Sequence, residues 1–118
     1  MVLLRVTVAL LLIGTLSACS NSSPSSPSNT SSVSIPVGAQ SLGANSYVPN
    51  PITVNSGTTV TWMNNDTIAH TSTSDTAGVF DSGSIPAGGQ FSFTTQAKGT
   101  FTYHCTFHKG MVGTLVVQ

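Results

Sequence analysis

Two runs of alternating residues near the C-terminus, 100–105 and 112–117, constrain the fold more than any other part of the chain. Side chains alternate between the two faces of a β-strand, so Phe101, Tyr103 and Cys105 share one face. Two aromatic residues mark this face as the buried one. The chain must turn back between the two runs, so we expect two neighbouring strands with Cys105 pointing inward at the end of the first.

The turn between these strands carries three side chains that bind metals: Cys105, His108 and Met111. A further histidine, His70, lies well upstream and follows a polar loop. One thiolate, two imidazoles and one thioether form the ligand set of a blue-copper electron-transfer site. Sulfur suits copper(I) and imidazole suits copper(II), so a rigid site with both holds either state with little rearrangement. We therefore predict one copper ion that cycles between Cu(I) and Cu(II) and is bound by all four residues.

Two other residues near this turn have different expected roles. His104 is adjacent to Cys105, but strand alternation directs it to the opposite face together with Thr102. We therefore interpret His104 as a surface histidine and not as a ligand. Gly110 is expected to supply backbone freedom where the loop between the two strands bends tightly.

The preceding residues also have the composition and the turn residues that are typical of a β protein. Residues 52–55 and 58–64 are predicted to be two strands joined by a tight turn, and residues 91–93 belong to another strand. Several short strands at this spacing indicate an all-β fold, an antiparallel sandwich or barrel. Most of its small core is expected to come from five aromatic residues: Trp62, Phe91, Phe93, Phe101 and Tyr103.

The first 32 residues differ in character from the rest. Residues 1–19 are predicted to be an export signal, with Arg5 before a short apolar run. The sequence Leu-Ser-Ala-Cys that ends at Cys19 resembles the lipobox of bacterial lipoproteins, in which the cysteine is lipidated and becomes the mature N-terminus. The alternative is an ordinary signal peptide cut at a small-residue site. Residues 20–32, rich in serine and proline, are predicted to be a flexible tether, and residues 33–118 a single domain.

These features predict an exported protein that is tethered to a membrane through lipid at Cys19, in the periplasm or at the cell surface. The chain has two cysteines, Cys19 and Cys105. A disulfide between them would tie the leader junction to the ligand-rich loop, so we reject that pairing. Lipidation of Cys19 leaves Cys105 alone. A lone thiol in an oxidising compartment is protected when a metal holds it as thiolate.

The charge content restricts the class of partner. Charged residues make up 5% of the chain, and its formal net charge is zero. This composition argues against nucleic-acid binding, which needs a basic surface, and against long-range steering of a charged partner. We expect a monomer whose redox donor and acceptor dock near His108, on an apolar rim that includes some of Leu42, Ile68 and Phe107.

The segments around these ligands resemble a known family. Residues 62–66, His70 and residues 103–111 are together similar to the cupredoxins, over a domain of about residues 33–118. The short Cys-x2-His-x2-Met loop is closer to amicyanin than to plastocyanin or azurin. The resemblance implies a Greek-key β-sandwich with one copper site. It carries the ligand role over to four residues: His70, Cys105, His108 and Met111.

Two positions depart from these relatives. The residue after the first histidine is asparagine in plastocyanin and amicyanin, where it ties the histidine loop to the ligand loop. Here that residue is Thr71, so the tie must differ. The residue before His108 is Phe107, where both relatives carry proline, so the loop is expected to be less stiff. Both departures bear on the reduction potential and not on the choice of metal.

Other functions fit the sequence less well. Structural zinc needs four Cys or His ligands, and with His104 turned away only three remain. A cysteine-nucleophile enzyme lacks a recognisable partner acid and leaves Met111 unexplained. A copper enzyme needs histidine clusters beyond the three histidines of this chain. A copper store or chaperone would use the same four ligands and remains the alternative. We therefore expect an electron carrier and not an enzyme.

Overall fold

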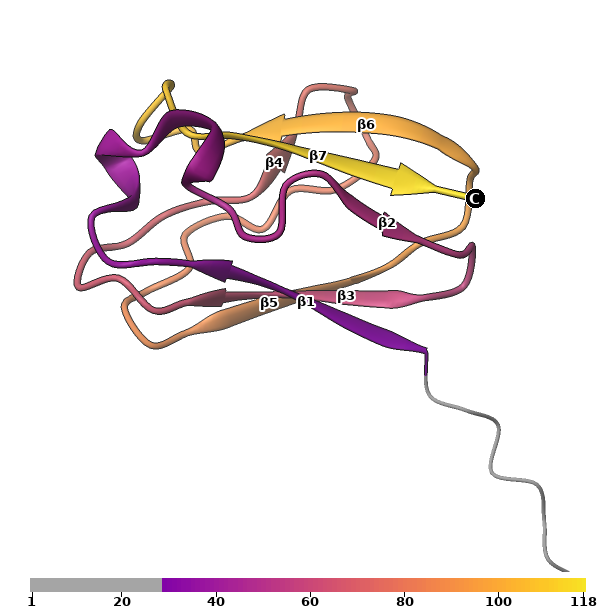
Figure 1. Cartoon of the computed structure of the whole chain (residues 1–118), viewed down its shortest axis with the longest axis horizontal. Coiled ribbons are helices and arrows are strands. Elements are labelled where there is room, and N and C mark those ends of the chain that lie inside the picture. Colours follow the sequence, from indigo (N-terminus) through magenta and orange to yellow (C-terminus); the bar gives the residue numbers. More distant parts are fainter. Residues whose placement is uncertain (1–28) are drawn as a thin grey trace, which may run out of the picture.

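The computed structural model describes residues 29–118, which form seven strands and two short helical turns (Figure 1). The strands are β1 (Thr30–Ile35), β2 (Ile52–Val54), β3 (Thr59–Asn64), β4 (Thr73–Ser74), β5 (Gln90–Thr94), β6 (Gly99–His104) and β7 (Val112–Val117). Two 3-10 helices, η1 (Ala39–Ser41) and η2 (Gly43–Asn45), lie between β1 and β2. None of the helices in the described part is long and apolar enough to cross a membrane. The predicted leader, Cys19 and the tether up to residue 28 lie outside the described residues.

The strands form two sheets that face each other as a sandwich (Figure 1). One sheet has the order β1-β3-β5 and the other has the order β2-β7-β6-β4. The predicted all-β sandwich is therefore confirmed. Its sheets are mixed and not purely antiparallel, because β1 pairs with β3 and β2 pairs with β7 in the parallel sense. Alternation predicts which face of a strand is buried but not the direction of its neighbour, so the sequence pattern does not reveal these parallel pairs.

The predicted strands on either side of Gly57 do not form a hairpin. β2 and β3 lie in different sheets, since Val54 pairs with Val117 and Thr59 pairs with Thr94. Gly57 has a φ of 87°, and this conformation lets the short connection cross from one sheet to the other. A strand buries one face in either sheet. The alternation of its residues therefore does not reveal which strand lies next to it.

The core lies between the sheets and is largely aromatic at its centre. Trp62 and Tyr103 are fully buried, as predicted. The other three predicted core residues are only partly buried and pack against its edge: Phe91, Phe93 and Phe101. Tyr47 and Phe80 complete the cluster, with ring centroids 4.8 Å from Tyr103 and 5.2 Å from Trp62 respectively. Both come from loops, which have no strand periodicity to indicate a buried side chain.

A glycine lets the two strands beside the ligand loop pack closely. Tyr103 in β6 pairs with Gly113 in β7. A β-carbon at residue 113 would lie 2.3 Å from the Tyr103 ring, so no larger residue fits there unless the ring moves. The fully buried ring therefore fills the core two residues before Cys105, and Gly113 provides the space for it.

The domain begins slightly before the predicted boundary at Val33. β1 starts at Thr30, which pairs with Thr59, and the carbonyl of Asn29 accepts a hydrogen bond from Thr59 N–H at 2.9 Å. The last residues of the predicted tether therefore belong to an edge strand. Exposed serine and threonine need no apolar partner there, so their composition does not distinguish an edge strand from a tether. β1 begins at the end of the sandwich opposite the loop between β6 and β7 (Figure 1).

Candidate metal centre

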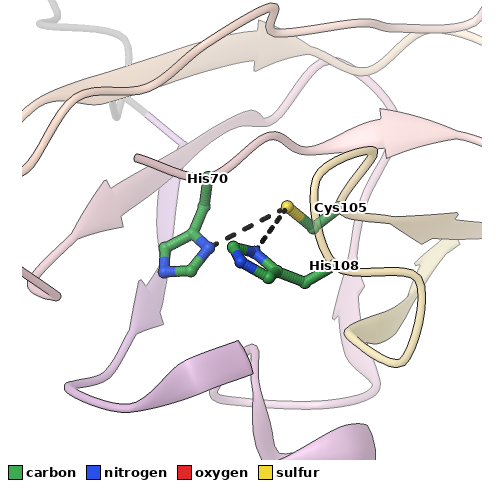
Figure 2. Close-up of side chains that lie close together, drawn as sticks. All are labelled: His70, Cys105 and His108. Atoms are coloured by element: carbon green, nitrogen blue, oxygen red, sulfur yellow. Dashed lines mark hydrogen bonds between the residues drawn. The ribbon is translucent and has the colours of Figure 1, made fainter. Parts of the chain in front are cut away.

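Three of the four predicted ligands meet at one end of the sandwich (Figure 2). The Nδ1 atoms of His70 and His108 lie 3.9 Å and 3.8 Å from Cys105 Sγ. The three ligand atoms lie within 4.8 Å of one another, and no second cluster of this kind occurs among residues 29–118. Residues that are far apart in the sequence, on the β3–β4 loop and after β6, are thus brought to one point.

Met111 is placed by the ligand loop. Its side chain is fully buried and belongs to the same core cluster as Cys105. Two backbone hydrogen bonds close the loop: Cys105 N–H donates to Met111 O at 3.2 Å, and Met111 N–H donates to His108 O at 2.9 Å. These bonds fix the main chain of the three loop residues relative to one another. Gly110 has no positive φ, so the bend does not use the backbone freedom that we predicted for this glycine.

His70 is held in the loop between β3 and β4. Its backbone pairs with Ile85: His70 N–H donates to Ile85 O at 3.1 Å, and Ile85 N–H donates to His70 O at 2.7 Å. His70 is completely buried, whereas His108 is partly exposed. Of the two imidazoles in the cluster, His108 is therefore the one that solvent reaches.

A buried carboxylate that the sequence analysis did not identify contacts His70. Asp66 Oδ2 lies 2.7 Å from His70 Nε2. Asp66 Oδ1 accepts backbone hydrogen bonds from Gly38 N–H at 3.1 Å and Thr67 N–H at 2.8 Å. The hydrogen bond with His70 and these two backbone bonds lower the pKa of Asp66 to about 2, so its carboxylate is charged at neutral pH. An Nε2–H donated to this carboxylate leaves the lone pair of Nδ1 facing Cys105 Sγ.

Asn64, at the end of β3, organises the same loop and was also missed. Its Nδ2 donates to the main-chain oxygens of Ile68 at 2.8 Å and Ile85 at 2.9 Å, and its Oδ1 accepts from Asp66 N–H at 3.0 Å. These bonds substitute for strand pairing in an irregular segment. The available signals were an asparagine at an inward-facing strand position and an acidic residue four positions before His70, since a polar group at a buried position needs partners.

Thr71 connects the histidine loop to the ligand loop. Its backbone N–H donates to Cys105 Sγ at 3.3 Å, and its Oγ1 accepts from Thr106 N–H at 2.8 Å. Its carbonyl accepts a hydrogen bond from the buried hydroxyl of Tyr47. The tie thus uses a hydroxyl where the resemblance led us to look for an asparagine side chain, and it joins the same two segments.

His104 lies outside the cluster, as strand alternation predicts. Its Nδ1 hydrogen-bonds to Asp75 Oδ1, and both side chains are partly exposed. A hydrogen bond with Thr102, together with the neighbouring His104, lowers the pKa of Asp75. The interpretation of His104 as a surface histidine is therefore confirmed.

The donor set fits copper better than zinc. Bonds of about 2.0 Å to a ring nitrogen and about 2.3 Å to sulfur, the lengths found at zinc, place these two donors about 3.5–3.7 Å apart, so their spacing fits a bound metal without choosing between copper and zinc. The distances of 3.8 Å and 3.9 Å from Cys105 Sγ to the two Nδ1 atoms are close to that value. The hydrogen bond from Thr71 N–H helps to fix the position of the sulfur. The thioether of Met111, whose side chain is fully buried in the ligand loop, suits copper and is a poor ligand for zinc.

Comparisons with known proteins agree with this site. Residues 33–118 match the model of a family described as copper binding proteins, plastocyanin/azurin family. A plastocyanin from Scenedesmus fuscus is 32% identical over 104 residues, covering 73% of this chain and 99% of that protein. A solved purple cupredoxin from Nitrosopumilus maritimus has a TM-score of 0.69 at 31% identity, covering 75% of this chain and 99% of that one. The Cu(I) form of an amicyanin mutant has a TM-score of 0.63 at 28% identity, covering 76% and 83%.

Removal of the Thr71 hydroxyl is expected to loosen the ligand loop. Thr71→Val keeps the side-chain shape and the backbone N–H but deprives Thr106 N–H of its acceptor. We expect the free energy of unfolding of the metal-free protein to fall by about 1–2 kcal/mol, as measured by urea titration. Thr71→Ser, which keeps the hydroxyl, should lose less. Thr61→Val removes a hydroxyl from an exposed pair with Ser92 and serves as the control. Equal stability of the two valine variants would contradict the role of Thr71.

Proposed function

The chain belongs to the plastocyanin/azurin family of copper-binding proteins, and on that premise we propose that it carries single electrons between redox partners. Copper is its cofactor, and one ion suits the single ligand cluster among the described residues. The observation that carries the proposal is a buried thiol with two imidazole nitrogens at 3.8 Å and 3.9 Å, in a loop that also buries the side chain of Met111.

We propose that the copper is bound by two imidazoles, one thiolate and one thioether. These groups belong to His70 and His108, to Cys105 and to Met111. Met111 would supply the thioether sulfur, a weak donor that suits copper. Bound there, copper supplies a one-electron Cu(II)/Cu(I) couple, and the surrounding protein holds the donors in place. His70 is fixed by Asp66, and Cys105 by the backbone N–H of Thr71. Donors that are positioned by the protein move little when the oxidation state changes, which favours fast electron transfer.

Electrons are proposed to enter and leave through His108. It is partly exposed, whereas His70 is buried. Exposed apolar side chains come from three neighbouring loops: Leu42, Ile68 and Phe107. These loops, the η1–η2 segment, the β3–β4 loop and the ligand loop, lie at the same end of the sandwich (Figure 1). Such a rim suits brief apolar docking of a redox donor and acceptor to a monomer.

A copper store or chaperone is the alternative function for the same ligands. Such a protein has to hand its metal to another molecule. The complete burial of His70, Cys105 and Met111 favours a protein that keeps its metal and exchanges electrons instead. Electron exchange with small redox reagents separates the two functions, because a store need not exchange.

The colour of the copper-loaded protein tests the ligand assignment. Charge transfer from the Cys105 thiolate to Cu(II) should make the oxidised protein intensely blue or green, with one copper per chain. Cys105→Ser should lose this band, because a serine oxygen does not supply it. His104→Ala, which changes a histidine outside the cluster, should keep the band. A Cys105→Ser protein that stays blue would overturn the assignment.

The docking face is tested by electron self-exchange between oxidised and reduced copies, measured by NMR line broadening. The formal net charge is zero, so we expect the rate to change little with ionic strength. Phe107→Lys should slow the exchange and make it salt-dependent, because two like charges would meet at the contact. Met63→Lys adds the same charge on the exposed face of β3 and should slow it less. Equal effects of the two variants would contradict docking at the ligand loop.

We also propose that the protein is exported and tethered to a membrane by lipid at Cys19, in the periplasm or at the cell surface. Support comes from the export-signal pattern and from the Leu-Ser-Ala-Cys sequence that ends at Cys19. β1 begins at the end of the sandwich away from the ligand loop (Figure 1). A flexible tether attached at that end leaves the end of the domain with the metal centre unattached and open to redox partners.

Fractionation of a bacterial host that expresses the full chain tests the anchor. The parent protein should be found with the membranes. Cys19→Ala should release the mature domain into the soluble fraction, because the thioether bond to lipid is lost. Cys105→Ser, which removes the other cysteine, should stay with the membranes. Equal membrane association of Cys19→Ala and the parent would rule out the lipid anchor.

A further inference from the structure

Asp66 differs from the other charged side chains in the described part of the chain. These side chains are few: Asp66, Asp75, Asp81, Lys98 and Lys109. Asp66 is the one that is buried, and the others are exposed. Burial of a carboxylate is costly unless the charge is paired or hydrogen-bonded. A chain with so little charge thus places one carboxylate in its interior, in direct contact with a ligand of the proposed copper site.

The two carboxylate oxygens of Asp66 have different partners: one accepts backbone hydrogen bonds, and the other contacts His70. Oδ1 accepts from the backbone of Gly38, just before η1, and from the backbone of Thr67. A neutral oxygen could accept both of these bonds. Oδ2 contacts His70 Nε2 at 2.7 Å, where both side chains are shielded from solvent. The full negative charge of Asp66 therefore acts chiefly on the His70 ring.

We propose that Asp66 sets the charge and the orientation of the copper centre by acting through His70. As a positioning residue, it holds the His70 ring with Nδ1 toward Cys105 Sγ, and its charge favours Cu(II) over Cu(I). The inference rests on the copper ligands assigned under the proposed function.

The direction in which Asp66 shifts the reduction potential follows from the sum of the buried charges. Cu(II), one thiolate and the Asp66 carboxylate sum to zero, whereas Cu(I) with the same two anions sums to −1. A net charge in a weakly screened interior costs more than a neutral group, so the carboxylate stabilises the oxidised state and lowers the reduction potential. The hydrogen bond to the carboxylate also makes the His70 ring a stronger electron donor, which strengthens its bond to the harder Cu(II) ion.

The charge effect is tested with three substitutions. Asp66→Asn removes the charge and leaves one side-chain oxygen where the parent has two, so His70 Nε2–H and the backbone N–H groups of Gly38 and Thr67 compete for it. Asp66→Glu keeps the charge on a longer side chain. Asp81→Asn is the control, because it makes the same chemical change at an exposed carboxylate that contacts no proposed ligand: its Oδ1 accepts from Gly83 N–H and from Thr73 Oγ1, and an amide oxygen can accept both bonds. Urea unfolding of each metal-free variant verifies that it folds.

Asp66→Asn should raise the reduction potential and lower the Cu(II) affinity roughly 10- to 100-fold, as measured against a competing chelator. The Cu(I) affinity should fall less. Asp81→Asn should change these quantities little, and Asp66→Glu should lie closer to the parent than Asp66→Asn does. A potential shift in Asp66→Asn no larger than that in Asp81→Asn would reject the role of Asp66. A colourless copper-loaded parent would instead reject the proposed copper function.

The positioning effect is tested without metal. The 15N shifts of the His70 ring report which nitrogen carries the proton in the metal-free protein. We expect the Nε2–H form in the parent, because the Asp66 carboxylate offers an acceptor to Nε2. Asp66→Leu removes the acceptor and should give a mixture of the two forms. An unchanged Nε2–H form in a folded Asp66→Leu protein would show that Asp66 does not orient the ring.

Discussion

The hydrogen bonds of the segment from Asn64 to Thr71 hold the two ligand segments together, and the geometry of the site depends on them. This segment has no regular pairing over most of its length, so side chains at its two ends and its middle supply the missing partners. Asn64 fixes the main chain, Asp66 fixes the His70 ring, and Thr71 reaches the sulfur and the following residue. Buried polar networks specify a unique arrangement only when their members are satisfied, and here the principal ones are. The donors are therefore placed by the protein before any metal binds.

The scarcity of charge has two consequences that meet at the metal site. The seven described strands contain no Asp, Glu, Lys or Arg, so the sheets carry no formal charge apart from any on His104. At the surface, this supports apolar contact as the main means of the docking that we propose near His108. In the interior, it leaves the field of Asp66 unopposed by other nearby fixed charges from the sheets. One buried carboxylate can therefore have a larger influence here than in a chain with a densely charged surface.

Local pattern predicted the parts of the fold that depend on local geometry. Alternation in β6 placed Cys105 inside and His104 outside, because period two is a property of any strand. The same rule could not pair β2 with β7, since partner choice is set by contacts distant in the sequence. It could not place Tyr47 in the core, because loops have no period. The role of Asp66 was also hidden, because one of its partners, Gly38, lies 28 residues away. His70 was predicted as a site residue from ligand chemistry and family resemblance, and not from local pattern.

The stiffness of the ligand loop does not require the proline that the resemblance led us to look for at position 107. On one side of Phe107, Thr106 N–H is bound by the hydroxyl of Thr71. On the other side, Met111 N–H is bound by the carbonyl of His108. The loop is thus fixed by hydrogen bonds before and after Phe107, and its own backbone conformation carries less of the constraint. Because proline is not needed at position 107, a large apolar side chain can stand there. Phe107 is 55% exposed and lies next to the partly exposed His108. The same departure from proline that was expected to weaken the loop therefore enlarges the apolar surface at which we propose that a partner docks.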